Sequence, residues 1–263
     1  MSVVDLTRFM EDLAAQSGAA ILPFFRGHFG TDDKARGSGH AFDPVTEADR
    51  AAEAVMRRLI RATFPDHGIL GEEFGSEGLD AEFVWVLDPI DGTRAFIAGL
   101  PTWGTLIGLT RNGAAVRGVM HQPYVGERFV GDGRSAAAHT ARGERRLRTR
   151  RCDRLADAIL ATTDPRLFAP GDERDRFRAV EDGVRMSRYG ADCYAYCMLA
   201  AGQIDLVVEA GLKPYDIVAL IPIVEGAGGR VTAWDGGPAT GGGRIVAAGD
   251  PRLHAAALEI LNA

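Results

Sequence analysis

A short apolar run that ends in acidic residues constrains this chain more than any other feature of its sequence. Residues 83–87 are continuously apolar, as in a strand buried on both faces, and they lead directly into Asp88-Pro89-Ile90-Asp91-Gly92-Thr93. Two carboxylates this close together repel and raise each other's pKa, and a divalent cation such as Mg²⁺ removes that cost. A helix that begins at Gly92-Thr93 offers its amides to a phosphate group. A lone Asp-x-x-Asp more often caps a turn, but together with the other acidic positions of the chain this pattern favours metal-assisted phosphoryl transfer.

Three further acidic positions lie at the ends of predicted elements rather than on exposed helix faces. Glu72, with Glu73 beside it, follows the short apolar segment 69–71. Asp49 lies in the first turn of a predicted helix, and Asp216 opens another helix directly after Lys213-Pro214-Tyr215. Carboxylate oxygens gathered from several element ends are the ligand set that Mg²⁺ prefers. We therefore group these three residues with the Asp88 and Asp91 pair as candidate metal-site residues.

The hydrophobic pattern predicts helices and then strands in the first part of the chain. Apolar residues at spacings of three and four predict a helix over residues 3–26, followed by a loop over 27–43 that is rich in Gly and Asp. A second helix is predicted from near Thr46 to about Phe64, with Thr46 as its N-cap. Strands are predicted over 103–110 and 115–121, joined by the hairpin pair Asn112-Gly113, and over 127–130.

The second part of the chain alternates between strands and helices. Strands are predicted at residues 158–162, 204–209, 230–234 and 245–248, and helices at residues 172–182, 193–201, 215–227 and up to residue 261. A β-rich meander followed by alternating elements predicts a layered fold of the α/β (or α+β) class, with alternating α and β layers. We expect two halves, residues 1–148 and 149–263, which form one compact unit and meet at a cleft.

Composition excludes several classes of function. No apolar run in the 263 residues approaches the roughly 18 that suggest a membrane span, and we expect no signal peptide because Asp5 and Glu11 interrupt the N-terminal region. The three cysteines leave one unpaired in any disulfide scheme, which favours a reduced cytoplasmic setting. The net charge of −6 argues against a general partner of nucleic acid or of an anionic membrane.

The acidic segments, taken together, resemble those of the inositol monophosphatase family, the lithium-sensitive, Mg²⁺-dependent phosphatases. The resemblance covers about residues 43–229 and rests on blocks that occur in the family's order. These blocks are Pro44-Val45-Thr46-Glu47-Ala48-Asp49, Gly71-Glu72-Glu73, Asp88-Pro89-Ile90-Asp91-Gly92-Thr93-Arg94-Ala95-Phe96, Tyr215-Asp216 and Glu225-Gly226-Ala227-Gly228-Gly229. The resemblance implies a sugar-phosphatase fold of the inositol monophosphatase type, two or three Mg²⁺ per active site, a small phosphate monoester as substrate and a homodimer.

The resemblance also implies a role for each matching residue. Glu72 and Asp88, with the carbonyl of Ile90, would bind the first metal, and Asp88, Asp91 and Asp216 would bind the second. Thr93 and Asp49 would orient and deprotonate the attacking water, and Glu72 belongs with them to the catalytic set. The amides of Gly92 and Thr93 would hold the phosphate, and Arg94 would contact the substrate. A lysine that the family often carries before the Pro44 block has no counterpart in Ser38-Gly39-His40-Ala41-Phe42, and this stretch receives no role.

Two segments resemble the histidinol-phosphatase branch of the family most closely. They are Trp103-Gly104-Thr105-Leu106-Ile107 and the stretch from Asp192-Cys193-Tyr194 to Glu209 and on to Lys213-Pro214-Tyr215. Histidinol phosphate ends in an ammonium and an imidazole, so its site should offer carboxylates, and Asp192 and Glu209 supply two. The branch's substrate is L-histidinol phosphate, an intermediate of histidine biosynthesis. Glu209 is also acidic in inositol phosphatases, so the substrate stays open at this point.

Other hypotheses and features complete the interpretation. An inositol-1-phosphate or broad sugar-phosphate phosphatase is the nearest alternative, followed by an adenosine 3′,5′-bisphosphate phosphatase and a non-catalytic regulator that binds phosphorylated ligands.

Cys193 and Cys197 are interpreted as packing residues rather than ligands of a soft metal. The arginine-rich stretch 142–151 is interpreted as a solvated basic loop rather than a nucleic-acid site. For Tyr194 and Tyr196, a place in the substrate pocket and ordinary packing remain equally open.

Overall fold

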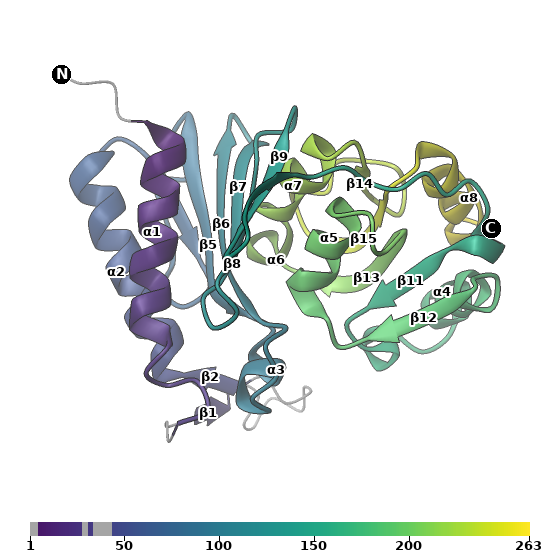
Figure 1. Ribbon diagram of the computed structural model, residues 1–263, viewed down its shortest axis with the longest axis horizontal. Helices are drawn as coiled ribbons and strands as arrows, with labels where there is room; N and C mark the ends of the chain where they lie inside the picture. Colours follow the sequence, from purple (N-terminus) through teal and green to yellow (C-terminus); the bar gives the residue numbers. More distant parts are fainter. Residues whose placement is uncertain (1–4, 28–30, 34–43) are drawn as a thin grey trace.

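Two large β-sheets alternate with three layers of helices in the computed structural model of this chain (Figure 1). The structure describes residues 5–27, 31–33 and 44–263, with the backbone alone for 31–33 and 44–46. The predicted loop over 27–43, including Ser38-Gly39-His40-Ala41-Phe42, therefore lies mostly outside the described residues. The alternation of helix and sheet layers confirms the predicted layered α/β fold.

The larger sheet contains eight of the described strands, all antiparallel to their neighbours except for one parallel pair, β3 and β5. Its strands are β3 (Gly68–Gly71), β4 (Gly75–Glu77), β5 (Phe83–Asp91), β6 (Gly104–Arg111), β7 (Ala114–Gln122), β8 (Glu127–Gly131), β9 (Ala136–Thr140) and β10 (Gly143–Arg146). In space they follow the order β10-β9-β8-β7-β6-β5-β3-β4. The predicted hairpin is present, because Asn112 and Gly113 both have positive φ, 50° and 79°, as a type I′ turn requires.

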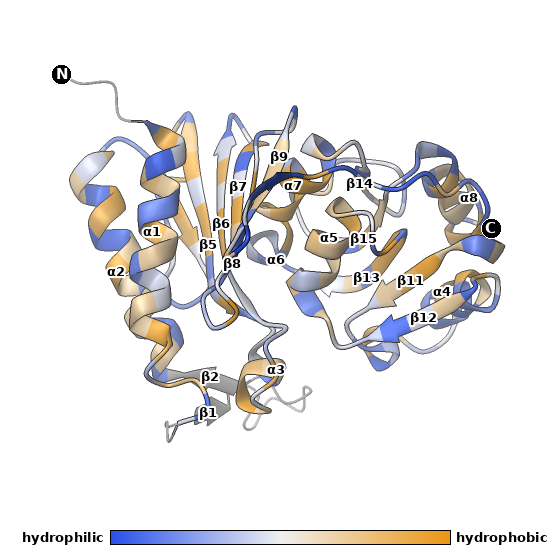
Figure 2. Ribbon diagram, viewed as in Figure 1, coloured by the Kyte–Doolittle hydropathy of each residue, from blue (hydrophilic) through white to orange (hydrophobic). Residues whose placement is uncertain are grey.

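Helices α1 (Leu6–Ile21) and α2 (Glu47–Thr63) cover one face of the larger sheet. Figure 2 shows orange, apolar residues along both helices and along the strands, and Met10 and Ile60 of the helices lie with Trp85 of β5 in one buried cluster. The structure ends α1 five residues before the predicted end at residue 26. Pro23 has no N–H group to continue the helical hydrogen bonds, which explains the early end.

The smaller sheet contains β11 (Ile159–Thr162), β12 (Met186–Tyr189), β13 (Leu206–Leu212), β14 (Arg230–Ala233) and β15 (Gly243–Ala248) among the described residues. Its order is β12-β11-β13-β15-β14, and β11 runs parallel to both of its neighbours. Helices α4 (Asp172–Asp182) and α8 (Pro251–Leu261) cover its outer face through a core that includes Phe177 and Leu253. Two short 3₁₀ helices, η1 (Leu155–Asp157) and η2 (Pro165–Leu167), lie in its connections.

Helices α5 (Asp192–Ala200), α6 (Pro214–Ile217) and α7 (Leu220–Gly226) form the layer between the two sheets. The core of this layer joins Leu106 of the larger sheet to Val207 of the smaller one. The single helix predicted over 215–227 is wrong, since α6 and α7 are separate helices. Pro222 cannot donate the hydrogen bond that would join it to residue 218, so a regular helix cannot run through this stretch.

The remaining elements lie near the end of β5 or at the sheet edges. Strands β1 (Thr31–Asp33) and β2 (Pro44–Thr46) pair with each other, and α3 (Thr93–Ile97) follows β5 directly.

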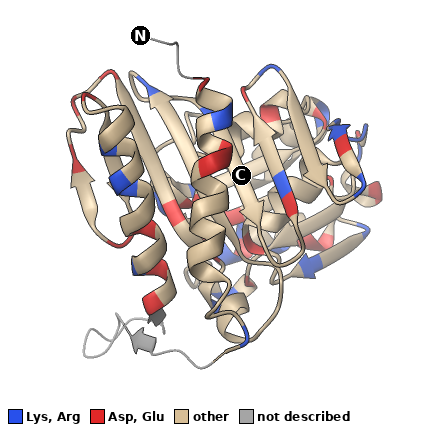
Figure 3. Ribbon diagram, turned by 60° about the vertical axis from the view of Figure 1, so that its left-hand side comes forward, with Lys and Arg blue, Asp and Glu red and all other residues tan. Residues whose placement is uncertain are grey.

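The stretch 142–151 is not simply a loop, because it contains the edge strand β10 and continues into the link between the sheets, where Arg150 pairs with Asp205. In Figure 3, basic and acidic residues are interspersed over the helices and strands. None of the helices in the described part of the chain has both the length and the apolar character of a membrane span.

Candidate active site

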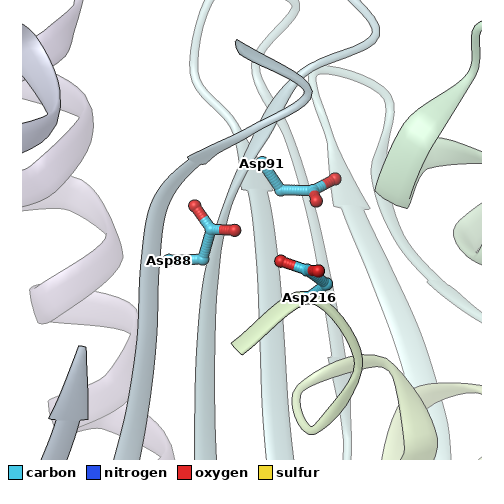
Figure 4. Close-up of side chains that lie close together, drawn as sticks. All are labelled: Asp88, Asp91 and Asp216. Carbon is cyan, nitrogen blue, oxygen red and sulfur yellow. The ribbon is translucent and has the colours of Figure 1, made fainter. Parts of the chain in front are cut away.

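Three aspartates from two distant segments meet beside the larger sheet. Asp88 and Asp91 belong to the last residues of β5, and Asp216 belongs to α6 (Figure 4). One carboxylate oxygen from each residue lies within 4.8 Å of the other two. The three carboxylates therefore form a compact all-oxygen cluster, as the sequence predicted for Asp88, Asp91 and Asp216.

An irregularity in β5 explains how two residues three positions apart contribute to one site. Successive side chains of a regular strand point to opposite faces, so residues i and i+3 would point apart. Asp88 pairs with Leu106 and Asp91 pairs with Gly104, which leaves one extra residue on β5. Such a bulge reverses the alternation of the side chains, and it allows both carboxylates to face Asp216.

A backbone amide orients each aspartate of the cluster. The N–H of Ile90 donates to Asp88 Oδ1 at 3.1 Å, and that of Cys193 donates to Asp91 Oδ2 at 2.8 Å. The N–H of Lys213 donates to Asp216 Oδ2 at 2.7 Å. Because each carboxylate has about four lone-pair positions, these single bonds leave capacity for a cation.

Burial and like charges make the cluster an unfavourable place for negative charge without a cation. Burial, followed by the charges of Glu72, Asp91, Asp216 and Asp49, raises the pKa of Asp88 well above its usual value. Burial also raises the pKa of Asp91, with Asp216 and Asp192 contributing. Burial raises the pKa of Asp216 to about 7, against the opposing effect of the Lys213 amide. A divalent cation would restore the charged forms, so the donor set fits a hard metal ion.

The cluster lines a pocket of about 320 Å³ between the two sheets. The pocket brings together every predicted site residue except Asp49, which is buried nearby and acts on the charge of Asp88. Among the described residues, the lining is Glu72, Asp88, Ile90, Asp91, Gly92, Thr93, Arg94, Thr163, Leu167, Asp192, Glu209, Ala210, Gly211, Leu212, Lys213, Tyr215 and Asp216. This lining carries six carboxylates and two basic side chains, which makes the pocket acidic.

The start of α3 borders the cluster. Gly92 has a φ of 83°, a value that favours glycine, and a Cβ at this position would lie 3.1 Å from Asp192. The hydroxyl of Thr93 donates to the carbonyl oxygen of Ile90 at 3.1 Å. The lone pairs of this hydroxyl therefore remain able to accept a hydrogen bond.

Two further carboxylates lie beside the cluster. Glu209 on β13 is buried, and burial raises its pKa to about 8 although Thr163 and Thr162 donate hydrogen bonds to it. Thr163 donates to Oε1 from its N–H at 2.7 Å and from its hydroxyl at 3.0 Å. Asp192 opens α5 with a positive φ of 44°, and burial raises its pKa to about 6 against the lowering effect of Arg94.

Thr163 and Leu167 are lining residues that the sequence reasoning missed. Both follow β11, which runs parallel to β13, so the carboxyl ends of these two strands lie at the same sheet edge. Loops that follow parallel strands commonly carry binding residues. Recognising β11 and β13 as a parallel pair would have pointed to Thr163.

The features set aside in the sequence have structural roles. All three cysteines are free and buried. Burial raises the thiol pKa of Cys193 and Cys197, so both thiols stay neutral, which is compatible with a packing role. Tyr194 donates a hydrogen bond to Glu127, and Tyr196 is buried in the core between the sheets. Neither tyrosine lines the pocket, so packing is the reading that the structure favours.

Comparison with known proteins gives the family of the chain. The family model described as the inositol monophosphatase family matches residues 3–263. The bifunctional phosphatase IMPL2, chloroplastic, of Arabidopsis thaliana is 42% identical over 277 residues, which cover 100% of this chain and 77% of the relative. The histidinol-phosphatase of Mycobacterium tuberculosis is 36% identical, with 84% of this chain and 85% of the relative covered.

A solved structure shows the same fold. The inositol monophosphatase from Zymomonas mobilis is 40% identical, covers 97% of both chains and superposes with a TM-score of 0.85. The aspartate cluster, the acidic pocket and the match over nearly the whole length agree with one another. The chain belongs to the inositol monophosphatase family and is a phosphoric monoester hydrolase.

Proposed function

We propose that this phosphatase hydrolyses L-histidinol phosphate to L-histidinol and inorganic phosphate, with Mg²⁺ as its cofactor. The observation that carries the proposal is the pair of carboxylates beside the aspartate cluster, the buried Glu209 and the half-buried Asp192. A substrate with a phosphate at one end and an ammonium and an imidazole at the other matches a metal site next to two acids. The similarity to the histidinol-phosphatase of Mycobacterium tuberculosis supports the same substrate.

The aspartate cluster supplies the metal site of this proposal. Glu72 and Asp88, with the carbonyl of Ile90, would hold one ion, and Asp88, Asp91 and Asp216 a second. When bound, the ions neutralise phosphate charge and lower the pKa of water. Thr93, whose hydroxyl already donates to Ile90, accepts a hydrogen bond from the attacking water, and Asp49 accepts its proton. The amides of Gly92 and Thr93 hold the phosphate oxygens, and Arg94 contacts the substrate.

Glu209 is prepared to receive a cationic group. Its Oε1 accepts two hydrogen bonds from Thr163, whereas Oε2 accepts one from Thr162 at 3.2 Å. The remaining lone pairs lie mainly on Oε2, so a substrate ammonium can donate there. The positive charge of that group favours the ionised form of Glu209, which burial alone disfavours.

An inositol-1-phosphate or broad sugar-phosphate phosphatase is the second candidate. The similarity to the inositol monophosphatase from Zymomonas mobilis favours it, and a carboxylate such as Glu209 can also accept hydrogen bonds from sugar hydroxyls. The two candidates share the metal site and differ only in what Asp192 and Glu209 recognise.

We include in the leading proposal a cytoplasmic location, which the free buried cysteines support. We also include a homodimer, which light scattering of the purified protein tests.

A substrate panel tests the proposed function. Phosphate release is measured with histidinol phosphate, inositol-1-phosphate, adenosine 3′,5′-bisphosphate and glycerol phosphate, each with Mg²⁺, with Ca²⁺ and with excess chelator. We expect the highest catalytic efficiency on histidinol phosphate with Mg²⁺, inhibition by Ca²⁺ because it accepts looser geometry, and no turnover in chelator. A clear preference for inositol-1-phosphate would replace histidinol phosphate with the second candidate. Full activity in chelator would refute the metal mechanism.

A further inference from the structure

One face of α2 carries three charged residues one helical turn apart, and only the first has a proposed role. Asp49, Glu53 and Arg57 follow each other at intervals of four, so they lie on the same side of the helix. Glu53 and Arg57 are both buried, with side chains 0% and 5% exposed, and Arg57 Nε lies 2.7 Å from Glu53 Oε1. Burying an ion pair costs free energy that its hydrogen bonds must offset. The hydrogen bonds of this pair therefore indicate its role.

The bonds of the Glu53 and Arg57 pair go to the backbone that carries Glu72. Glu53 Oε2 accepts from the N–H of Glu73 at 2.7 Å, and Oε1 accepts from the N–H of Phe74 at 3.2 Å. Arg57 donates to the carbonyl oxygen of Gly75. The two side chains thus bind three consecutive residues that follow Glu72 directly.

The main chain just before and at Glu72 is also held in place, by a hydrogen bond to β5 and by close contact with Glu53. The N–H of Glu72 donates to the carbonyl oxygen of Leu87 at 3.2 Å, next to Asp88. A Cβ at Gly71 would lie 2.0 Å from Glu53 Oε1, so the carboxylate rests against the backbone of residue 71. The main chain at Glu72 is therefore held by β5 on one side and by Glu53 on the other.

A purely structural tie between α2 and the hairpin of β3 and β4 does not need this buried pair. Arg61 and Glu77 already join α2 to β4 by a bidentate contact, with side chains 58% and 39% exposed, and Arg57 adds only a longer contact with Glu77 at 3.6 Å. In contrast, Glu53 contacts the amides beside a pocket carboxylate whose charge acts on both Asp88 and Asp216. We infer that Glu53, supported by Arg57, is a positioning residue that fixes the carboxylate of Glu72 for metal binding. The inference rests on the metal site of the proposed function.

Direct measurement of Mg²⁺ binding by titration calorimetry tests this inference without relying on turnover. Glu53→Gln keeps the size of the side chain but replaces one acceptor oxygen with an NH₂ group. This NH₂ group cannot accept a hydrogen bond from the N–H of Glu73 or Phe74, so one bond to the turn is lost. We expect its Mg²⁺ affinity to fall by about 10- to 100-fold, the usual effect of losing a partner that orients a metal ligand. Arg57→Lys is the milder variant, because it keeps the buried charge and loses the contact with Gly75. It should weaken binding in the same direction by a smaller factor.

Two control variants separate positioning from loss of stability. Ile60→Val removes a buried methyl group from the same helix, and Arg61→Gln removes the exposed tie to β4. Thermal unfolding is measured for every variant. We expect both controls to bind Mg²⁺ as the wild type does, even where their unfolding temperature falls as far as that of Glu53→Gln. A control that loses as much affinity at equal stability would overturn the inference.

A double-mutant cycle with Glu72→Gln decides whether Glu53 acts through Glu72. If it does, adding Glu53→Gln to Glu72→Gln should change the remaining Mg²⁺ affinity by less than about twofold, within the usual error of additivity. Unchanged binding by folded Glu53→Gln, or a full further loss in the Glu72→Gln background, would refute the positioning role. Absence of Mg²⁺ binding by the wild type is a different result, since it would refute the proposed metal site itself.

Discussion

Gly92 and Asp192 lie so close together that a side chain at position 92 would be strained and would press on Asp192. Gly92 has a φ of 83°, and Asp192, 3.1 Å from the Cβ that Gly92 lacks, has a φ of 44°. A non-glycine residue in the left-handed region costs about 1 kcal/mol or more and tends to persist at functional sites. Aspartate and asparagine tolerate this region better than most residues. Replacing Asp192 with asparagine therefore changes its charge with little effect on the backbone.

Asp192→Asn should alter substrate preference rather than the metal site. We expect kcat/KM for histidinol phosphate to fall by about 10- to 100-fold, because a charge-assisted hydrogen bond is worth ~1.5–3 kcal/mol. Assays are run near pH 8, where Asp192, with a pKa of about 6, is ionised. Glycerol phosphate has no cationic group, so its hydrolysis and the Mg²⁺ dependence should barely change. Equal losses on both substrates would assign Asp192 to the fold or to the metals.

Asp91→Asn tests the metal cluster itself. Asparagine keeps an oxygen that can accept the N–H of Cys193 but loses the charge that faces Asp216. Turnover should fall by at least ~10²-fold, the scale expected for a lost group that acts on transition-state charge. Asp216→Asn should have a similar effect. Asp80→Asn, on an exposed turn, is the matched control and should retain full turnover. A folded Asp91→Asn protein with near wild-type turnover would contradict the assignment.

At the scale of elements, Thr163, directly after β11, orients Glu209 of β13 through two hydrogen bonds. Thr163→Val removes the hydroxyl that donates to Glu209 Oε1 at 3.0 Å and leaves the backbone N–H in place. We expect kcat/KM for histidinol phosphate to fall by about tenfold, since a hydrogen bond to a charged group is worth ~1.5 kcal/mol. The Mg²⁺ dependence should stay the same. Thr163→Ser restores the hydroxyl and should recover most of the loss, whereas equal losses in both variants would contradict this role.

Elements with strong local signals could be predicted from the sequence, and those without them could not. The apolar run of β5 and the Asn112-Gly113 turn are local features, and the structure confirms both. The strands β9 and β10 lie at or beside the edge of the larger sheet, where alanines and arginines give little β signal. Pro23 and Pro222 explain the two helix errors, because each interrupts an otherwise helical apolar pattern.

At the scale of the whole molecule, the pocket draws on both sheets and on the layer between them. Asp88 comes from the larger sheet, Glu209 from the smaller one, and Asp216 from the helix between. The acids of the metal site could be predicted one by one because each lies at or near the end of an element, whereas Asp192 and Glu209 were predicted from the family resemblance. Their neighbours Thr163 and Leu167 could not, since only the strand order brings the end of β11 to the pocket.

This gathering of acids should make the stability of the metal-free protein fall as the pH rises. Burial raises the pKa of Glu209 from 4.5 to about 8 and that of Asp216 from 3.8 to about 7. The folded state therefore binds more protons than the unfolded state from about pH 4 to about pH 8, and the free energy of unfolding falls across this window. Thermal unfolding in chelator should show this decline.

Magnesium should oppose the decline, and more strongly at high pH. A cation competes with protons for Asp216 and its neighbours, so the rise in Tm at saturating Mg²⁺ should be larger at about pH 8 than at about pH 6. Glu209 is not among the proposed metal ligands, so its share of the decline should persist in Mg²⁺ and be removed by Glu209→Gln. An equal Mg²⁺ shift at both pH values would contradict proton competition at the cluster. A Glu209→Gln protein that keeps the full decline in Mg²⁺ would show that Glu209 is already ionised in the folded wild-type protein.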